Sequence, residues 1–226
     1  MLIRGKKQED RRGRFSQGFT LVELLIAVAI AGIVMGGIYS VYRSQQSSYV
    51  AQAQVTALEQ QVRAAMFFMQ RDISMAGCDP TGHANAGILT AGSNFIRFTE
   101  DLNGNGDPGE YNEDIAYALY RTGGVQKLGR KTPFTATNQP VAEGVDALDF
   151  VYLDAAGNVL LTPVSDPSRI RSVQITLVVR GEKADPHFSN TTIYRNQFGA
   201  RIFGPANDHF RRRLLTAEVL CRNLAF

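Results

Sequence analysis

The first long apolar segment of the chain begins at Phe19 and ends at Tyr42. Its 24 residues contain a single charged side chain, that of Glu23. At about 1.5 Å of rise per residue, a helix of this length spans roughly 36 Å, enough to cross the ~30 Å hydrocarbon core of a bilayer. A cleaved secretory signal has a shorter apolar region that is followed by a small-residue cleavage site. The pattern therefore predicts a membrane anchor with its transmembrane part at residues 19–42.

A helical period of apolar positions continues beyond this anchor. The apolar residues recur at spacings of three and four, which places them on one face of a helix, and polar residues fill much of the remainder. The stripe consists of Val55, Leu58, Val62, Met66, Met69 and Ile73. Gly77, which is followed closely by Pro80, is the expected C-cap. We predict one long helix over residues 19–77, with an amphipathic second half that packs on a sheet.

After Gly77 the pattern changes to short strands separated by turn residues. Apolar and polar side chains alternate most clearly around residues 173–180, as in a half-buried strand. The other predicted strands are 94–99, 115–120, 148–153 and 214–223, with a hairpin turn at 154–158 and a surface loop at 181–190. Residues 78–226 are therefore predicted to form a β-rich globular domain. A long helix packed on an antiparallel sheet makes the predicted fold class α+β.

Basic residues are concentrated in a leader that precedes the anchor. Residues 1–18 hold six basic side chains and two acidic ones, namely Arg4, Lys6, Lys7, Arg11, Arg12 and Arg14 against Glu9 and Asp10. The whole chain carries a formal charge of +3, whereas residues 19–226 have 18 basic and 19 acidic side chains. Basic residues before an anchor hold that end in the cytoplasm. Because the rest of the chain has no basic excess, no nucleic-acid partner is predicted.

A specific motif stands where the leader meets the anchor, Gly18-Phe19-Thr20-Leu21-Val22-Glu23-Leu24-Leu25-Ile26-Ala27. A carboxylate inside an apolar span costs about 2.5–3.5 kcal/mol, so Glu23 needs a partner unless it lies at the membrane interface. The basic leader, the Gly18/Phe19 junction and an acid four residues beyond Phe19 resemble the processing site of type IV prepilins and of type II secretion pseudopilins.

The resemblance implies that a prepilin peptidase cleaves after Gly18 and that the new amino group of Phe19 is N-methylated. Glu23 would then pair with the Phe19 amino group of a neighbouring subunit during assembly. The resemblance also implies a single-pass protein of the inner membrane, with its globular domain in the periplasm, that later enters a pilus at the cell surface. The implied partners are other minor and major pilins, the prepilin peptidase and the inner-membrane assembly platform.

Three further segments are similar to the minor pilins called PilW. They are residues 71–77, residues 113–117, and the run 211–213 that leads to residues 222–223. This resemblance implies a structural subunit that contributes to initiation and assembly of a type IV pilus, and to pilus-dependent adhesion or motility. A minor pseudopilin at the tip of a type II secretion pseudopilus is the close alternative. A membrane-anchored binding domain that never polymerises is the second.

The two cysteines, Cys78 and Cys221, are far apart and lack the CxxC spacing of thiolate metal sites. If the globular domain lies outside the cytoplasm, one disulfide between them is the natural expectation. The bond would join the end of the long helix to the last predicted strand. The alternative is two buried free thiols.

Residues 101–107, Asp-Leu-Asn-Gly-Asn-Gly-Asp, place oxygen side chains at alternate positions as in the first half of an EF-hand-type calcium loop. Asn112 stands where the late bidentate acid of that loop belongs. We choose Glu113 for that role, because Asp114 abuts the predicted strand. The predicted calcium ligands are Asp101, Asn103, Asn105, Asp107 and Glu113. The alternative is a turn whose Asn and Asp side chains cap their own backbone.

The sequence contains no motif that predicts an enzyme. His83, His187 and His209 are scattered without the spacing of a metal-binding helix. There is also no Gly-x-Ser-x-Gly elbow, no Walker loop and no dinucleotide fingerprint following a strand. We therefore expect a non-enzymatic protein without a cofactor other than the calcium ion considered above.

Overall fold

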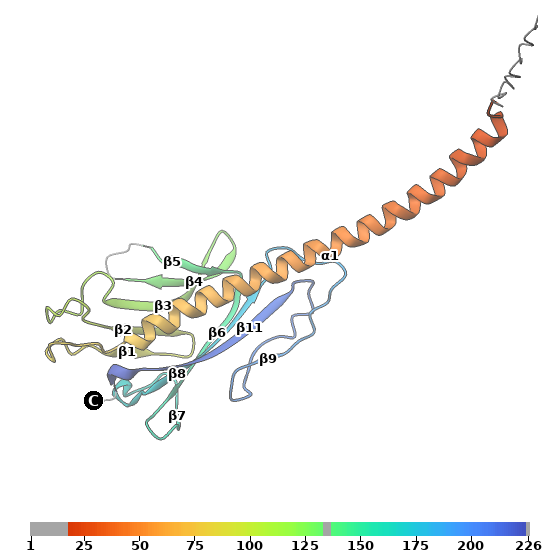
Figure 1. The fold of residues 1–226 in the computed structure, drawn as a ribbon. Coiled ribbons are helices and arrows are strands. Elements are labelled where there is room, and N and C mark those ends of the chain that lie inside the picture. Colours follow the sequence, from red (N-terminus) through yellow and green to blue (C-terminus); the bar gives the residue numbers. More distant parts are fainter. Residues whose placement is uncertain (1–17, 133–136, 225–226) are drawn as a thin grey trace, which may run out of the picture. The chain divides into compact units, whose positions relative to one another are not determined.

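A computed structural model describes residues 18–132 and 137–224, so the predicted leader lies outside the described residues except for Gly18. One long helix, α1 (Leu21–Met75), precedes all the strands (Figure 1). The chain divides into two compact units, residues 1–49 and 50–226. Helix α1 begins two residues after the predicted boundary and ends two residues before it, because capping residues flank it at both ends.

The part of α1 in the first unit is apolar and exposed. An 18-residue window within α1 reaches a mean hydropathy of 2.5, and none of its side chains is buried. By length and composition this segment is a candidate membrane span. An exposed run of this kind is not stable against water in a lone soluble chain, which is why the anchor interpretation fits it.

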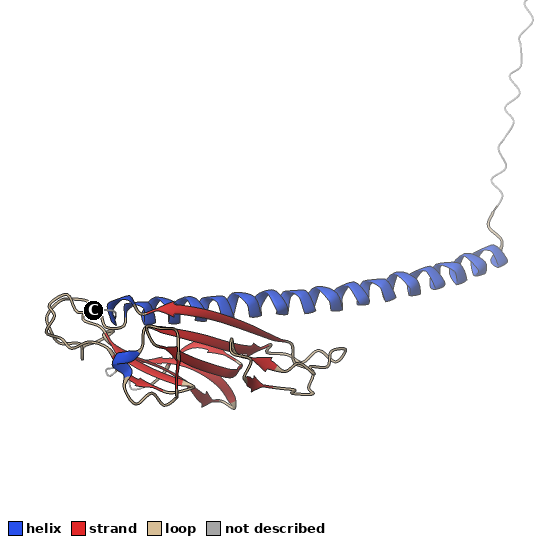
Figure 2. Cartoon of the chain, turned by 90° about the horizontal axis from the view of Figure 1, so that it is seen from below, coloured by secondary structure: helices blue, strands red, loops and turns tan. Residues whose placement is uncertain are grey.

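The second half of α1 belongs to the globular unit, where it lies along one side of the strands (Figure 2). Five of the six predicted stripe residues are buried, and Val55 at the start of the stripe is half-buried. Ala65 and Asp72 complete the buried face. The 3.6-residue period of apolar positions thus identified the packed face of the helix correctly, but it missed the buried acid Asp72.

The strands form two larger antiparallel sheets and a small hairpin sheet. The first larger sheet is a meander in the order β1-β2-β3-β4-β5, and the second has the order β11-β8-β6-β7. Their bounds are β1 (Ile88–Ala91), β2 (Phe95–Thr99), β3 (Asp114–Thr122), β4 (Val125–Lys131), β5 (Gln139–Glu143), β6 (Val145–Leu153), β7 (Val159–Leu160), β8 (Ser172–Arg180) and β11 (Arg212–Leu220). The hairpin pairs β9 (Tyr194–Arg195) with β10 (Arg201–Phe203), and two short 3-10 helices are η1 (Pro167–Arg169) and η2 (Arg222–Leu224).

One hydrophobic core joins the second half of α1 to both larger sheets. Met69 and Ile73 of α1 share it with Phe98 of β2, Leu177 of β8 and Val219 of β11. Burial of each such side chain stabilises the fold by about 1.5–3 kcal/mol. A long helix packed on antiparallel sheets confirms the predicted α+β class.

Candidate functional site

The predicted processing junction lies immediately before α1. Gly18, Phe19 and Thr20 are exposed, and Phe19 is 82% exposed. The Thr20 N–H donates to Glu23 Oε2 at 2.9 Å, and the Thr20 hydroxyl donates to the same oxygen at 2.8 Å. In return, the Glu23 N–H donates to Thr20 Oγ1 at 3.2 Å. This reciprocal pattern is a capping box, in which residues at N-cap and N3 satisfy N–H groups that the helix leaves unpaired.

The capping box is a second use for Glu23 that sequence reasoning missed, although the Thr-x-x-Glu signal is legible at residues 20–23. Glu23 has an intrachain partner in the single subunit, so its charge is not left without a hydrogen bond. Pairing with the amino group of a neighbouring Phe19 stays a prediction. The structure does bring Gly18, Phe19 and Glu23 together at one helix end.

At the other end of α1, the buried carboxylate of Asp72 joins the helix to the first sheet. Its Oδ2 accepts hydrogen bonds from the Tyr117 hydroxyl at 2.8 Å and from Arg130 Nε at 2.7 Å. Its Oδ1 accepts from Arg71 Nε at 3.0 Å and from Arg71 Nη2 at 2.8 Å. Both oxygens are therefore satisfied, which removes much of the cost of burying the charge.

The C-terminal segment also reaches this end of α1. Asn223 Nδ2 donates to the carbonyl oxygen of Met75 at 3.2 Å. Gly77 has a φ of +79°, and a Cβ built on it would lie 2.4 Å from Leu224 Cδ2. The positive φ favours glycine there, and a Cβ would require the Leu224 side chain to shift. Helix end and chain end are thus packed against each other.

A second buried ionic group ties β11 to the strands and loops beside it. The Arg212 side chain is 1% exposed, and its Nε donates to Asp146 Oδ2 at 2.6 Å. Its Nη1 and Nη2 donate to the two carboxylate oxygens of Asp208 at 2.5 and 2.6 Å. This two-pronged arrangement is the strong geometry of an arginine–carboxylate pair.

The predicted disulfide between Cys78 and Cys221 is wrong, because both cysteines are free. Cys221 lies in the hydrophobic core, where burial raises the pKa of its thiol to about 12. Cys78 is half-buried, and burial together with the charges of Glu100 and Asp101 raises the pKa of its thiol. The last strand ends before Cys221, and it is the following η2 that carries the chain to the helix end.

The residues of the predicted calcium loop are engaged with one another. Asp101 is fully buried, and its Oδ1 accepts the N–H groups of Gly104 at 2.7 Å and Asn105 at 3.2 Å. Its Oδ2 accepts the Gly106 N–H at 2.9 Å. The carbonyl-type oxygens of Asn103 and Asn105 and the Oδ1 of Asp107 each accept a backbone N–H two residues further on. These are the bonds that the turn alternative expects.

Glu110 and Glu113 approach the loop from its C-terminal side. The Asn103 and Asn105 side-chain amides donate to the carboxylate of Glu110 at 2.8 and 3.0 Å. Glu113 Oε1 accepts the N–H groups of Leu102 at 2.9 Å and Asn103 at 3.2 Å. Within residues 18–132 and 137–224, no group of three or more His, Cys, Asp or Glu side chains is arranged to hold a metal ion. Calcium binding by the five predicted ligands stays a prediction.

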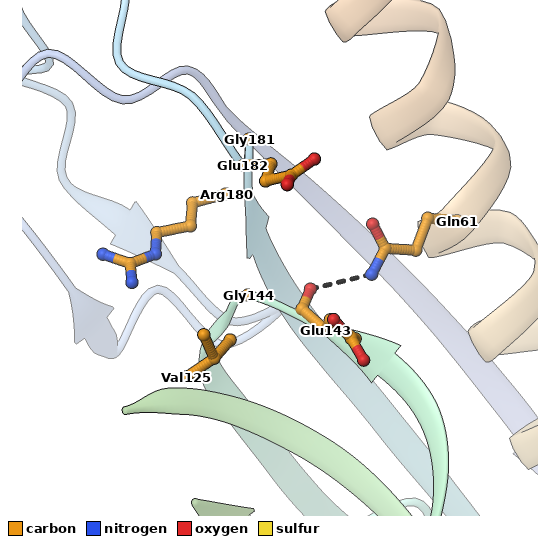
Figure 3. Close-up of a pocket in the computed structure, with 7 residues that line it drawn as sticks. All are labelled: Gln61, Val125, Glu143, Gly144, Arg180, Gly181 and Glu182. Atoms are coloured by element: carbon orange, nitrogen blue, oxygen red, sulfur yellow. Dashed lines mark hydrogen bonds between the residues drawn. The ribbon is translucent and has the colours of Figure 1, made fainter. Parts of the chain in front are cut away.

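A pocket of about 430 Å³ opens between α1 and the ends of β5 and β8 (Figure 3). On its helix side, Gln61 Nε2 donates to the carbonyl oxygen of Glu143 at 2.7 Å. The lining also includes Arg180 and Glu182, and it contains no His, Cys or Ser side chain. These residues offer no nucleophile beside a base. His187 lies elsewhere, in the same loop as Asp185, and His209 Nδ1 lies 2.6 Å from the carbonyl oxygen of Phe188.

Comparisons with known proteins agree with the geometry at both ends of the chain. Residues 13–39 match the prokaryotic N-terminal methylation motif. Residues 112–223 match the family described as type IV pilus-assembly protein W. A type IV-like pilin from Thermus thermophilus is similar in structure, with 16% sequence identity and a TM-score of 0.50. The match covers 75% of this chain and 100% of that one, and at this identity it bears on the fold alone. The comparison with curated proteins gives no match.

Proposed function

We propose that this chain, a type IV pilin-like protein similar to PilW-type minor pilins, is a low-abundance subunit that initiates or caps a type IV pilus. In this role it acts with other minor pilins and with the major pilin. Pilus-dependent adhesion or motility then depends on it indirectly, through the number of pili that form.

The observation that carries the proposal is the N-terminal segment. The methylation motif at residues 13–39 covers the junction, the acid and most of an apolar helix whose side chains are exposed. A simple membrane anchor has no use for a Gly18/Phe19 junction or for a carboxylate four residues beyond it. A subunit that leaves the bilayer for a filament core uses both, because the new amino group and the carboxylate can pair between subunits.

The segment also supports a route through the cell. The subunit is inserted in the inner membrane as a single-pass protein with residues 50–226 in the periplasm. Prepilin peptidase cleaves after Gly18, Phe19 is methylated, and the assembly platform transfers the subunit into the filament. The match to the pilus-assembly W family favours a pilus over a secretion pseudopilus.

Substitution of Glu23 tests the proposal in cells that assemble the pilus. Glu23→Gln keeps a side chain that can cap the helix, as Glu and Gln both serve at N3, but it removes the charge. We expect normal or improved membrane insertion, since a charge in an apolar span is unfavourable. We expect the amount recovered in sheared filaments to fall by at least about tenfold, as loss of a charge-assisted hydrogen bond predicts.

Glu59→Gln is the matched control, because Glu59 is a half-buried acid on the same helix that pairs with Arg63 and Arg213. It should enter filaments at the wild-type level. Equal recovery of Glu23→Gln and the wild type in sheared filaments would exclude charge pairing as the basis of assembly. Recovery of both only in membranes would instead favour an anchored protein that does not polymerise.

A further inference from the structure

The core-facing side of β2 and β3 ends in two carboxylates. Side chains alternate along a strand, so Ile96, Phe98 and Glu100 lie on one face of the first sheet. The register pairs Thr99 with Asp114, and the next pair continues it, with the Glu100 N–H donating to the carbonyl oxygen of Glu113 at 2.8 Å. Directly opposite residues place their side chains on the same face. The apolar face of this sheet therefore ends in Glu100 and Glu113.

Both carboxylates are buried, and each has an oxygen without a partner. Glu100 is 4% exposed and Glu113 is 3% exposed. The Oε2 of each is inaccessible and has no hydrogen-bond partner among the described residues. A buried acceptor that lacks a donor costs about 1–3 kcal/mol, and more when it is charged. Two like charges directly opposite each other add to this cost.

The arginines nearby do not satisfy these oxygens. Arg71 and Arg130 both bind the carboxylate of Asp72. Arg97, on the opposite face of β2, binds Asp114. Two buried carboxylate oxygens therefore have no hydrogen-bond partner among the described residues, next to the loop whose Leu102 and Asn103 N–H groups bind Glu113.

We propose that the unpartnered oxygens of Glu100 and Glu113 bind a calcium ion, with further oxygens supplied by the adjacent loop or by water. Glu113 links the ion to this loop, since its other oxygen accepts the N–H groups of Leu102 and Asn103. Asp101 instead stabilises the turn, because its carboxylate accepts three backbone N–H groups. Among the predicted ligands, Glu113 is kept and Glu100 is added.

The chemistry favours calcium over other cations. Carboxylate and carbonyl oxygens select hard cations. Calcium accepts irregular coordination, whereas magnesium requires a near-ideal octahedron and retains its water. Zinc in proteins is held mainly by sulfur and nitrogen ligands, which the two carboxylates do not supply. Neutralising the two carboxylates and fixing the loop stabilises the folded domain.

The test is titration of calcium-depleted full-length protein in detergent micelles at pH 8, with calcium chloride alone as the probe. Calorimetry should give one ion per chain with a Kd of about 10⁻⁴–10⁻³ M. The Tm should rise by about 3–6 °C between EDTA and ~5 mM calcium. Glu100→Gln and Glu113→Gln should each weaken binding by at least about tenfold, because each removes one charged ligand.

The difference in Tm between Glu100→Gln and the wild type should change sign when calcium is added, which a purely structural role does not predict. In EDTA, Glu100→Gln should melt above the wild type, since it removes a buried unpaired charge. In calcium it should melt below the wild type. Glu182→Gln, at an exposed acid outside the loop, should match the wild type in both conditions. The proposal is overturned if calcium produces neither heat nor a Tm shift, if both ligand variants bind as tightly as the wild type, or if zinc binds and calcium does not.

Discussion

At the N-terminus of α1, the Glu23 carboxylate has an intrachain partner in Thr20 and an intermolecular one in the proposed assembly. Thr20→Val separates the two roles, because it removes the hydroxyl of the capping box and leaves the Glu23 charge in place. Loss of this cap should destabilise the first helical turn by about 1 kcal/mol. We expect Thr20→Val to enter sheared filaments at a level close to that of the wild type. A defect as large as that of Glu23→Gln would show that capping, rather than charge, controls assembly.

Arg212 is the buried cation whose loss should cost the most stability. Arg212→Met keeps most of the side-chain volume but leaves Asp146 and Asp208 without their partner. Removing one member of a buried pair costs about 3–5 kcal/mol, and because Asp208 is partly exposed we expect about 3 kcal/mol. Urea unfolding of the full chain in detergent, followed by near-ultraviolet circular dichroism, measures the change.

The neighbouring Arg213 is the control for this measurement. Arg213 binds Glu59 at 2.8 Å, but their side chains are 47% and 39% exposed. Surface pairs of this kind are worth up to about 1 kcal/mol, so Arg213→Met should have a small effect. Equal effects of the two substitutions would contradict the structural role given to Arg212.

The Arg212 pair also predicts a dependence on acid. The hydrogen bonds from Arg212 lower the pKa of Asp208. A lowered folded-state pKa means that the pair contributes stability above the ordinary pKa of an aspartate, about 3.9, and loses it as pH falls through the lowered value. In the wild type, stability should therefore decline more steeply below about pH 4 than in Arg212→Met. Parallel declines in urea unfolding across this range would contradict the assignment.

The junction between α1 and the C-terminal η2 depends on one glycine. Gly77 combines a positive φ with contact to Leu224, whereas Gly82 has a φ of +69° and nothing within 4 Å of a built Cβ. Gly82→Ala should therefore cost only the backbone strain, about 1–2 kcal/mol. Gly77→Ala adds overpacking and should cost about 2–4 kcal/mol.

A double substitution distinguishes packing from strain at Gly77. Leu224→Ala opens the space that the new methyl group needs, so the combined variant should be more stable than the sum of the two single changes predicts. The measurement is the same urea unfolding. Additive effects would mean that Leu224 does not press against the helix end.

The elements that could be predicted from sequence are those with a sustained period. The stripe from Leu58 to Ile73 and the alternation along β8 each repeat often enough to identify a buried face. The strands at 94–99, 115–120 and 148–153 and the turn at 154–158 were also found. The strands β7, β9 and β10 were missed because they span two or three residues and have no period to read, and the longer β1, β4 and β5 were missed too. Residues 221–223 were assigned to a strand, but β11 ends at Leu220 and η2 begins at Arg222.

The residues that could not be predicted are polar groups whose partners are distant in sequence. Asp72 stood at helical spacing within the apolar stripe, yet only the fold brings Tyr117 and Arg130 to it. Glu100 carried no signal, because its opposition to Glu113 depends on the register of β2 and β3. The predicted Cys78–Cys221 disulfide was wrong for the same reason. The sequence does not show how the turn after β11 orients Cys221 relative to the end of α1.

Across the whole molecule, the three segments that resemble PilW proteins meet. Asp72, from the segment at the end of α1, binds Tyr117 of the second segment. Met75, in the same first segment, accepts a hydrogen bond from Asn223 of the third. The match to the W family covers the second and third segments, and the structure joins the first to them. The three segments thus meet at the C-terminal end of α1. The processing motif lies at its N-terminal end.

The most direct test of the central claim is the mass of the chain recovered from sheared filaments. The account predicts a mature polypeptide that begins at N-methylated Phe19 and lacks residues 1–18. Gly18→Leu, which blocks access of the junction to a peptidase that needs a small residue, should leave the full-length chain in the membrane fraction and none in filaments. Recovery from filaments of a chain that still begins at Met1 would contradict the account.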